Sequence, residues 1–279
     1  MEAANGNSTA TLRPDVRLVA LDLDGTLLDS NKLIDDDTVA ALKAACARGV
    51  LVVIASARPP RGVRHIYQQL ELRTWQINYN GALIWDEGAG QPVFHRPMQA
   101  AVVRQIIDVS RDFYDEVGVH VELLDRWFTD RPVEHYVTET GKLFQPDGIV
   151  PVEQFCQSPI TKLMLMGDAP MLMRLESLLL PRFGRLVTIV STDSHLMQIM
   201  DARVSKAVAL RKIALHHAIR RDQVMAVGDA PNDLGMLQYA GIAVAMENAH
   251  PVVKTESDWI APSNDSRGVL AALKRFGVA

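Results

Sequence analysis

Short, uninterrupted apolar runs alternate with amphipathic stretches in the first third of the chain. Runs without polar alternation are typical of strands buried on both faces, as in a parallel sheet. The predicted elements are strands over residues 16–21, 50–55 and 75–79, with helices from Asp35 to Gly49 and from Pro59 to Leu70 between them. The order strand, helix, strand, helix, strand predicts a parallel sheet with right-handed crossovers.

The same alternation of apolar runs with amphipathic stretches occurs again near the C-terminus. Strands are predicted over residues 223–227, 242–245 and 259–261, and helices over residues 205–217, 232–239 and 267–276. We therefore expect the two ends of the chain to contribute to one α/β core.

The middle of the chain has a different pattern, in which short strands follow one another across turns. Strand pairs are predicted over residues 119–124 with 127–129 and over 185–190 with 195–200, beside a strand over 160–166 and a helix over 170–180. This pattern is typical of an α+β domain with an antiparallel sheet. A cluster of four methionines in this part of the chain indicates core packing more than a soft binding surface: Met164, Met166, Met171 and Met173.

These patterns predict an α/β fold, in which a Rossmann-like parallel-sheet core is interrupted by an inserted α+β domain. The core comprises residues 15–86 and 200–279, and the insertion comprises residues 87–199, with the glycine-containing segment 88–92 read as the boundary. Residues 1–14 are polar and lack an apolar block, so we expect a mobile tail and no secretion signal there.

Composition and charge exclude several classes of protein. The 29 basic and 33 acidic residues give a formal net charge of -4, which offers no overall attraction to nucleic acid or anionic membranes. No apolar run approaches the roughly 18–20 residues that a membrane span needs. The two cysteines, Cys46 and Cys156, are too few for a disulfide framework or a cysteine metal cluster, and they fit a reducing, cytoplasmic environment.

Two acidic motifs directly follow predicted strands. They are Asp22-Leu23-Asp24-Gly25-Thr26-Leu27 and Gly228-Asp229-Ala230-Pro231-Asn232-Asp233. Taken alone, the first could be an ordinary Asp-Gly turn, and Asn232 and Asp233 could simply cap the next helix. Because the carboxyl ends of parallel strands meet at one edge of a sheet, the four carboxylates are expected to converge there. Converging carboxylates need a cation between them, and an all-oxygen set of ligands favours Mg²⁺.

Two single residues would carry little weight in isolation. Ser56 follows the second strand, where a serine is usually a helix cap or a turn residue. Lys206 opens a helix, where a lysine is usually a solvated charge. Both gain meaning only from their positions relative to the two acidic motifs.

In order and spacing, residues 22–26, Ser56, Lys206 and residues 228–233 resemble the four motifs of the haloacid dehalogenase superfamily of phosphohydrolases. The resemblance is sharper to its Cof-type subgroup, whose members insert a large C2-type cap between the second and third motifs. Like them, this chain has Asn80-Gly81-Ala82 after the third strand and Arg58 two positions after the hydroxyl residue. Two positions depart from the pattern: Ser56-Ala57-Arg58 replaces the usual Thr-Gly-Arg, and Ala230 stands where the fourth motif usually has glycine.

The resemblance implies a phosphatase that works through an aspartyl-phosphate. Asp22 would be the nucleophile, and Asp24 would protonate the leaving alcohol and then activate water, a role that requires a raised pKa. Mg²⁺ would be held by Asp22, the backbone carbonyl of Asp24 and Asp229, with Asp233 in or near that shell. The groups implied to bind the phosphoryl oxygens are Ser56, the backbone N–H of Ala57, Lys206 and Asn232. Substrate contacts are implied for Arg58, Asn80 and Gly81, although a plain turn is an equal alternative for the last two.

Small phosphorylated metabolites, such as sugar or cofactor phosphates, are the substrate class that the resemblance implies. Specificity should come from cap residues that face the cleft. The polar candidates, each of them more often surface or scaffold than ligand, are His120, Glu122, Arg126, Lys162 and His195. A phosphomutase on the same core and a non-catalytic phosphosugar-binding regulator are the alternatives. The oligomeric state is not readable from the sequence.

Overall fold

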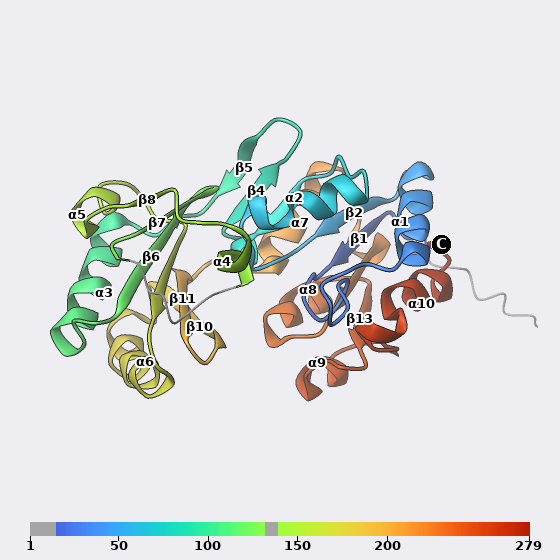
Figure 1. The fold of residues 1–279 in the computed structure, drawn as a ribbon. Helices are drawn as coiled ribbons and strands as arrows, with labels where there is room; N and C mark the ends of the chain where they lie inside the picture. The colour runs from blue at the N-terminus through green and yellow to red at the C-terminus, as the bar shows by residue number, and fades with distance from the viewer. Residues whose placement is uncertain (1–14, 132–138) are drawn as a thin grey trace, which may run out of the picture.

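A computed structural model describes residues 15–131 and 139–279 of the chain. The tail expected over residues 1–14 lies outside the described residues. Within the described part, the chain forms a five-stranded, a six-stranded and a three-stranded sheet. Figure 1 shows the five-stranded sheet with its helices at one end of the molecule and the six-stranded sheet at the other.

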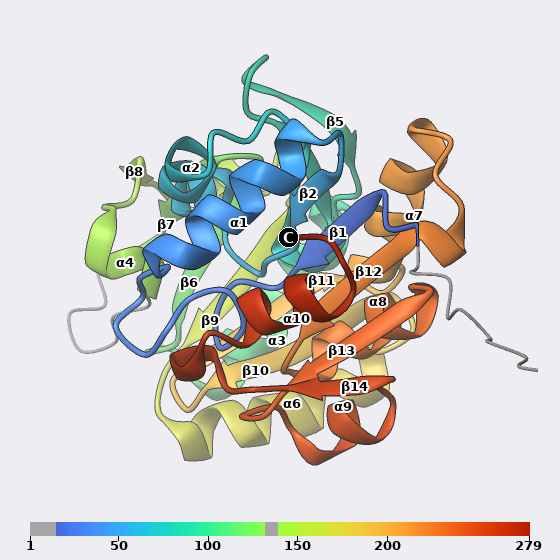
Figure 2. The ribbon, with the colours of Figure 1, turned by 90° about the vertical axis from the view of Figure 1, so that its right-hand side faces the viewer.

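The five-stranded sheet is parallel throughout and takes strands from both ends of the chain. Its strands, side by side in Figure 2, are in spatial order β14 (Trp259–Ala261), β13 (Ile242–Met246), β12 (Val224–Gly228), β1 (Leu18–Leu21) and β2 (Leu51–Ile54). Leu21 at the end of β1 pairs with Val227 of β12 and with Ile54 of β2, so these three strands end at the same edge. The predicted parallel-sheet core is confirmed.

Helices cover both faces of this sheet. They are α1 (Asp36–Ala47), α2 (Pro60–Gln69), α7 (Lys206–His216), α8 (Leu234–Tyr239), α9 (Pro251–Thr255) and α10 (Gly268–Arg275). Helices α1 and α10 pack together on one face, and α7 and α8 on the other (Figure 1). Short 3₁₀ turns lie between these elements: η1 (Tyr79–Gly81), η2 (Arg221–Gln223), η3 (Pro231–Asp233) and η4 (Asn264–Ser266). In residues 15–131 and 139–279 no helix combines the length and apolar character needed to cross a membrane.

The third predicted strand has a different place from the one that the simple alternation suggests. β3 (Gln76–Asn78) lies beside β2 but is joined to this sheet only by an isolated parallel bridge, between Ile77 and Ala55, the residue after β2. Its main partner is the antiparallel strand β4 (Leu83–Asp86), which in turn pairs with β5 (Gln91–His95). Residues 88–92, read from the sequence as a boundary, therefore form the turn of the β4–β5 hairpin and the start of β5.

The six-stranded sheet forms the inserted part and is antiparallel except for its last pair. Its strands, in spatial order, are β10 (Val187–Asp193), β11 (Leu196–Asp201), β9 (Lys162–Met166), β6 (Gly118–Leu123), β7 (Arg126–Thr129) and β8 (Gly148–Ile149). The accompanying helices are α3 (Ala100–Phe113), α4 (Glu139–Leu143), α5 (Val152–Phe155) and α6 (Ala169–Phe183). One apolar cluster joins α3 and α6 to one face of this sheet. The predicted α+β character of the insertion is confirmed.

The methionines of the insertion do not all belong to the core. Met164, Met166 and Met171 are buried, whereas Met173 is 70% exposed. Met171 and Met173 are two positions apart on α6, and a helix turns residues at that spacing toward different sides. Core packing is therefore correct for three of the four side chains and wrong for Met173.

Candidate active site

Three carboxylates gather at the edge of the five-stranded sheet where β1 and β12 end. Asp22 follows β1, and its N–H donates to the carbonyl of Val227 (3.0 Å), which fixes Asp22 beside the end of β12. Asp229 follows β12 directly, and Asp233 ends the turn η3 behind it. One oxygen from each carboxylate lies within 4.8 Å of the other two. The parallel strands thus bring together side chains that are about 200 positions apart in the sequence.

Lys206 supplies the cation that these carboxylates face. Its ammonium group donates to Asp22 and, over 2.6 Å, to Asp233. Burial and the nearby carboxylate of Asp233 raise the pKa of Asp22 well above its ordinary value, against the opposing effect of Lys206. Burial by itself would lower the pKa of Lys206, but the attraction of Asp22 and Asp233 outweighs it and raises that pKa. The first residue of α7 is therefore a buried charge, not a solvated one.

Asp233 organises the turn as well as contributing a charge. Its second oxygen accepts hydrogen bonds from the N–H groups of Asp229 and Ala230, both over 3.0 Å. Burial raises the pKa of Asp229, and the hydroxyl of Thr26 donates to it over 2.9 Å. Asp233 therefore holds the loop that follows β12, and the bond from Thr26 to Asp229 links that loop to the one that follows β1.

Asp24 belongs to a separate set of contacts. Arg58 donates to both of its oxygens (2.6 and 2.8 Å), and Lys32 donates to it over 2.8 Å. Burial acts to raise the pKa of Asp24, but the hydrogen bonds and charges of Arg58 and Lys32 outweigh it and hold that pKa below its ordinary value. The raised pKa expected from the sequence is therefore wrong for this arrangement. Arg58, for which a substrate contact is expected, binds this carboxylate.

The second motif lies in the turn after β2. Ser56 is buried, and its hydroxyl oxygen accepts a hydrogen bond from the N–H of Arg58 (3.1 Å). Its own N–H donates to Ile77 in β3 over 2.9 Å. Ala57, half-buried, lies between the serine and the arginine in the same turn. The hydroxyl hydrogen of Ser56 is not used in these bonds, so it is free to be donated to a ligand.

Asn80 and Asn232, two residues predicted to lie near the site, are in direct contact. The side-chain N–H of Asn232 donates to the side-chain oxygen of Asn80 over 3.0 Å. Gly81 follows with a φ of 99°, and a Cβ added there would come within 2.2 Å of the carbonyl oxygen of Ser205. Glycine is required here for close approach and for backbone conformation alike. Since Ser205 precedes Lys206, the third strand's turn packs against the start of the helix that carries the buried lysine.

Lys32 and Asn248, two further residues at this edge, were missed in the sequence. The side-chain N–H of Asn248 donates to the backbone carbonyl of Gly25 over 2.7 Å, which holds the loop between Asp24 and Thr26. Asn248 follows β13, so applying the strand-end argument to that strand would have selected it. Lys32 lies in an exposed loop, and no local pattern marks it.

The polar cap candidates divide into buried and exposed residues. Glu122 and Lys162 face each other across β6 and β9. Glu122 accepts two hydrogen bonds from Arg61 of α2 (2.8 and 2.9 Å), and Lys162 donates to Gln198 over 3.1 Å. Burial raises the pKa of Glu122 and lowers the pKa of Lys162 to about 8. His120 is also buried, whereas Arg126 and His195 are exposed.

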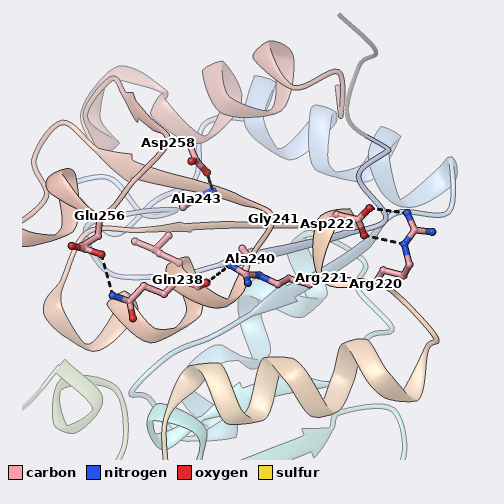
Figure 3. Close-up of a pocket in the computed structure, with 10 residues that line it drawn as sticks. Arg220, Arg221, Asp222, Gln238, Ala240, Gly241, Ala243, Glu256 and Asp258 are labelled. Carbon is pink, nitrogen blue, oxygen red and sulfur yellow. Dashed lines mark hydrogen bonds and ion pairs between the residues drawn. The ribbon is translucent and has the colours of Figure 1, made fainter.

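A hollow of about 620 Å³ lies at the opposite edge of the sheet (Figure 3). Gly241, which lines it, donates its N–H to the carbonyl of Val224 at the start of β12, whereas Asp229 follows the end of that strand. Figure 3 shows charged and polar side chains of this hollow bound to one another, as Arg220 is to Asp222 over 2.8 Å. This hollow is therefore not part of the acidic site.

Comparison with known proteins gives relatives over nearly the whole chain. The family model for haloacid dehalogenase-like hydrolases matches residues 19–273. A putative phosphatase of Streptococcus pyogenes is 31% identical over 268 residues, which cover 94% of this chain and 98% of the relative. A Bacillus subtilis 5-amino-6-(5-phospho-D-ribitylamino)uracil phosphatase is 29% identical, with 93% and 97% covered. The crystal structure of a haloacid dehalogenase-like hydrolase from Bacteroides thetaiotaomicron is similar with a TM-score of 0.85 and 27% identity, over 93% of this chain and 99% of that one.

Proposed function

Because the chain belongs to the haloacid dehalogenase-like hydrolases and is a phosphatase of that family, we propose that it hydrolyses small phosphomonoesters with Asp22 as the nucleophile. The observation that carries this proposal is the setting of Asp22, a nearly buried carboxylate at the end of β1 that binds Lys206 and lies close to Asp229. A carboxylate held in this way attacks phosphorus more readily than one surrounded by water, and the product of that attack is an aspartyl-phosphate.

Two steps then complete the hydrolysis. In the first, an oxygen of Asp22 forms a bond to phosphorus while the bond from phosphorus to the ester oxygen breaks, and the leaving oxygen takes a proton from Asp24. In the second, water displaces Asp22 from phosphorus and gives a proton to Asp24. Arg58 and Lys32 hold Asp24 as a carboxylate, the form that the second step uses. Asp24 must therefore part from Arg58 before it carries the proton needed for the first.

Hydrogen-bond donors around Asp22 would hold the phosphoryl group that is transferred. We assign this part to the hydroxyl of Ser56, the backbone N–H of Ala57, the ammonium of Lys206 and the amide of Asn232. Negative charge spreads over the phosphoryl oxygens in the transition state, so donors fixed in advance stabilise it. The replacement of Thr-Gly by Ser56-Ala57 keeps both a hydroxyl and a backbone N–H at these positions.

The acidic cluster fits a magnesium ion by its donor set. Asp22, Asp229 and Asp233 offer only carboxylate oxygens, three of which lie within 4.8 Å of one another, and hard divalent cations prefer such ligands. We propose that Asp22 and Asp229 hold Mg²⁺ together with the backbone carbonyl of Asp24, with Asp233 in or near that shell. Bound there, the ion would reduce the repulsion between the carboxylate of Asp22 and the negatively charged substrate.

The proposed substrates are small phosphorylated metabolites, and the cap would choose among them. One relative is named for a substrate that carries a phosphorylated ribityl chain, which is an ester of this class. We also propose the division of the chain into a core of residues 15–95 and 200–279 and a cap of residues 96–199; because β5 pairs with β4, the first boundary lies after β5 and not at residue 86, where the sequence predicts it. The buried contact between Arg61 of α2 and Glu122 of β6 would then join the cap to the core.

The test is release of inorganic phosphate from p-nitrophenyl phosphate by the purified full chain, measured with Mg²⁺ and with EDTA. We expect activity with Mg²⁺, its loss in EDTA and its return when Mg²⁺ is restored. Asp22→Asn should lower turnover by more than about a thousandfold while the thermal unfolding midpoint stays close to that of the unchanged protein. Asp112→Asn, which changes an exposed carboxylate on α3, is the matched control and should leave turnover unchanged.

Each part of the proposal has its own contrary outcome. Turnover by Asp22→Asn within tenfold of the unchanged protein would remove Asp22 as the nucleophile. Full activity in EDTA would show that the reaction needs no metal ion. Transfer of the phosphoryl group to a second position of a sugar phosphate, with no inorganic phosphate released, would make the protein a phosphomutase.

A further inference from the structure

Three consecutive residues after β3 have left-handed backbone conformations. The φ angles of Tyr79, Asn80 and Gly81 are 50°, 53° and 99°. Glycine and asparagine adopt this region readily, but a bulky aromatic residue does so only when its surroundings force it. Such strain is found preferentially at functional sites, where neighbouring contacts hold it in place.

The two ends of this turn are fixed by different parts of the molecule. The hydroxyl of Tyr79 lies 2.7 Å from the carbonyl oxygen of Leu124 and 3.1 Å from Glu122, both in or next to β6 of the six-stranded sheet. Gly81 is pressed against the carbonyl of Ser205, just before α7. The residue between them cannot move without disturbing one of these contacts.

Asn80 is that residue, and both its backbone and its side chain are oriented. Its N–H donates to the carbonyl of Ser56 over 3.1 Å, and its side-chain oxygen accepts the hydrogen bond from Asn232. The side-chain nitrogen of Asn80 is buried and has no hydrogen-bond partner among the described residues. Turning the amide over would place two NH₂ groups opposite each other, so only the observed orientation serves Asn232.

We infer that Asn80 is a positioning residue, which acts by fixing the side-chain amide of Asn232 for binding a phosphoryl oxygen. The inference rests on the proposed function, because the role of Asn232 belongs to it. An unrestrained asparagine amide turns freely about its last side-chain bond, and the acceptor on Asn80 removes that freedom. The strained turn keeps the acceptor in place, since it is anchored at Tyr79 and at Gly81.

A double-mutant cycle tests this inference in the full chain. Asn80→Gly removes the amide but tolerates the left-handed backbone, so the turn is retained. It is compared with Asn232→Ala and with the double variant, both as kcat/KM for p-nitrophenyl phosphate and as the dissociation constant of inorganic phosphate. Thermal unfolding midpoints are measured for all four proteins to identify any loss of fold. The dissociation constants of phosphate allow the four proteins to be compared even when Asn232→Ala turns over too slowly for an accurate kcat/KM.

We expect Asn80→Gly to lower kcat/KM about tenfold in the unchanged protein and less than about twofold in the Asn232→Ala background, because the acceptor then has nothing to position. Equal losses in both backgrounds, or no loss in either, would overturn the inference. A protein that binds phosphate without hydrolysing the ester would refute the proposed function, and the cycle would then be decided by the dissociation constants. A protein that binds no phosphate would overturn both.

Discussion

The ammonium group of Lys206 donates a hydrogen bond to the carboxylate of Asp22, although 184 positions separate the two residues in the sequence. The side chain of Lys206 is fully buried and that of Asp22 is only 9% exposed. Asp233, also fully buried, binds the same ammonium group. Two carboxylates and one ammonium group have thus been removed from water together, and the single ammonium group offsets the cost of burying both carboxylates.

Removing the cation should therefore destabilise the fold as well as stop the reaction. We expect Lys206→Met to lower the free energy of unfolding by about 3–5 kcal/mol, because Asp22 and Asp233 are left buried without a counter-charge. Urea unfolding in a buffer with EDTA measures this, since no metal ion then replaces the ammonium group. Adding Asp233→Asn to Lys206→Met should restore part of the stability and none of the activity. If the double variant is less stable than Lys206→Met alone, charge burial is not the cause.

The strand-end argument predicts much of this site because it depends only on parallel strands. Asp22, Ser56 and Asp229 each follow a strand of one sheet, so their meeting at one edge required no knowledge of side-chain contacts. The pairing of Arg58 with Asp24 could not be predicted in that way. Their separation in sequence says nothing about which cation a carboxylate faces, and that cation reversed the expected direction of the pKa of Asp24.

Local glycine and proline signals explain where the fold prediction failed. Residues 88–92 carry the composition of a linker as well as that of a hairpin turn, and only the pairing of β4 with β5 distinguishes the two. The order strand, helix, strand, helix, strand predicts β3 in the main parallel sheet, whereas its ladder of strand pairs is with β4. Strand partners depend on contacts distant in sequence, which local patterns do not contain.

Gly81 should be far less replaceable than Gly49, although both have positive φ angles. Nothing lies within 4 Å of a Cβ added at Gly49, so Gly49→Ala should cost only the backbone term of about 1 kcal/mol. At Gly81 the same methyl group meets the carbonyl of Ser205, so we expect Gly81→Ala to cost at least about 2 kcal/mol more. Urea unfolding of the two variants measures the difference. Equal losses would mean that the turn moves away from α7 without penalty.

The ion pair between Arg61 and Glu122 should contribute more to stability than an exposed pair of the same kind. Arg61 donates to both oxygens of Glu122, and the two side chains are 8% and 2% exposed. Glu122→Gln leaves the buried guanidinium without this carboxylate, so we expect the free energy of unfolding to fall by about 3 kcal/mol.

Arg104→Gln, which breaks the exposed pairs with Asp108 on α3 and Glu153 on α5, is the control and should cost no more than about 1 kcal/mol. Hydrogen exchange adds a readout of position: amides of α2 and of β6 should lose protection together in Glu122→Gln, because the pair joins these two elements. Loss confined to β6 would contradict a joining role.

The buried His120 predicts a loss of stability in mild acid. Trp127 donates its indole N–H to Nδ1 of His120 over 3.2 Å, which requires the neutral ring, and burial lowers the pKa of His120 from 6.5 to about 4. Between pH 6.5 and 4 the unfolded chain therefore binds more protons at this residue than the folded chain, so stability falls as the pH falls. From pH 7.5 to pH 5 this contribution amounts to about 2 kcal/mol.

His120→Asn keeps an acceptor near the position of Nδ1 and removes the titration, so it isolates this effect from the other acidic groups. We expect the variant to lose about 2 kcal/mol less than the unchanged protein when urea unfolding is compared at pH 7.5 and pH 5. The direction follows from the lowered pKa of His120: in acid the unfolded chain gains a proton at the histidine that the buried ring does not take up, so the folded state becomes less favourable. Asparagine binds no proton in either state, so this part of the acid destabilisation is absent from the variant. Equal losses of stability in the two proteins would show that His120 binds its proton as readily in the folded chain as in the unfolded one, so that burial does not lower its pKa.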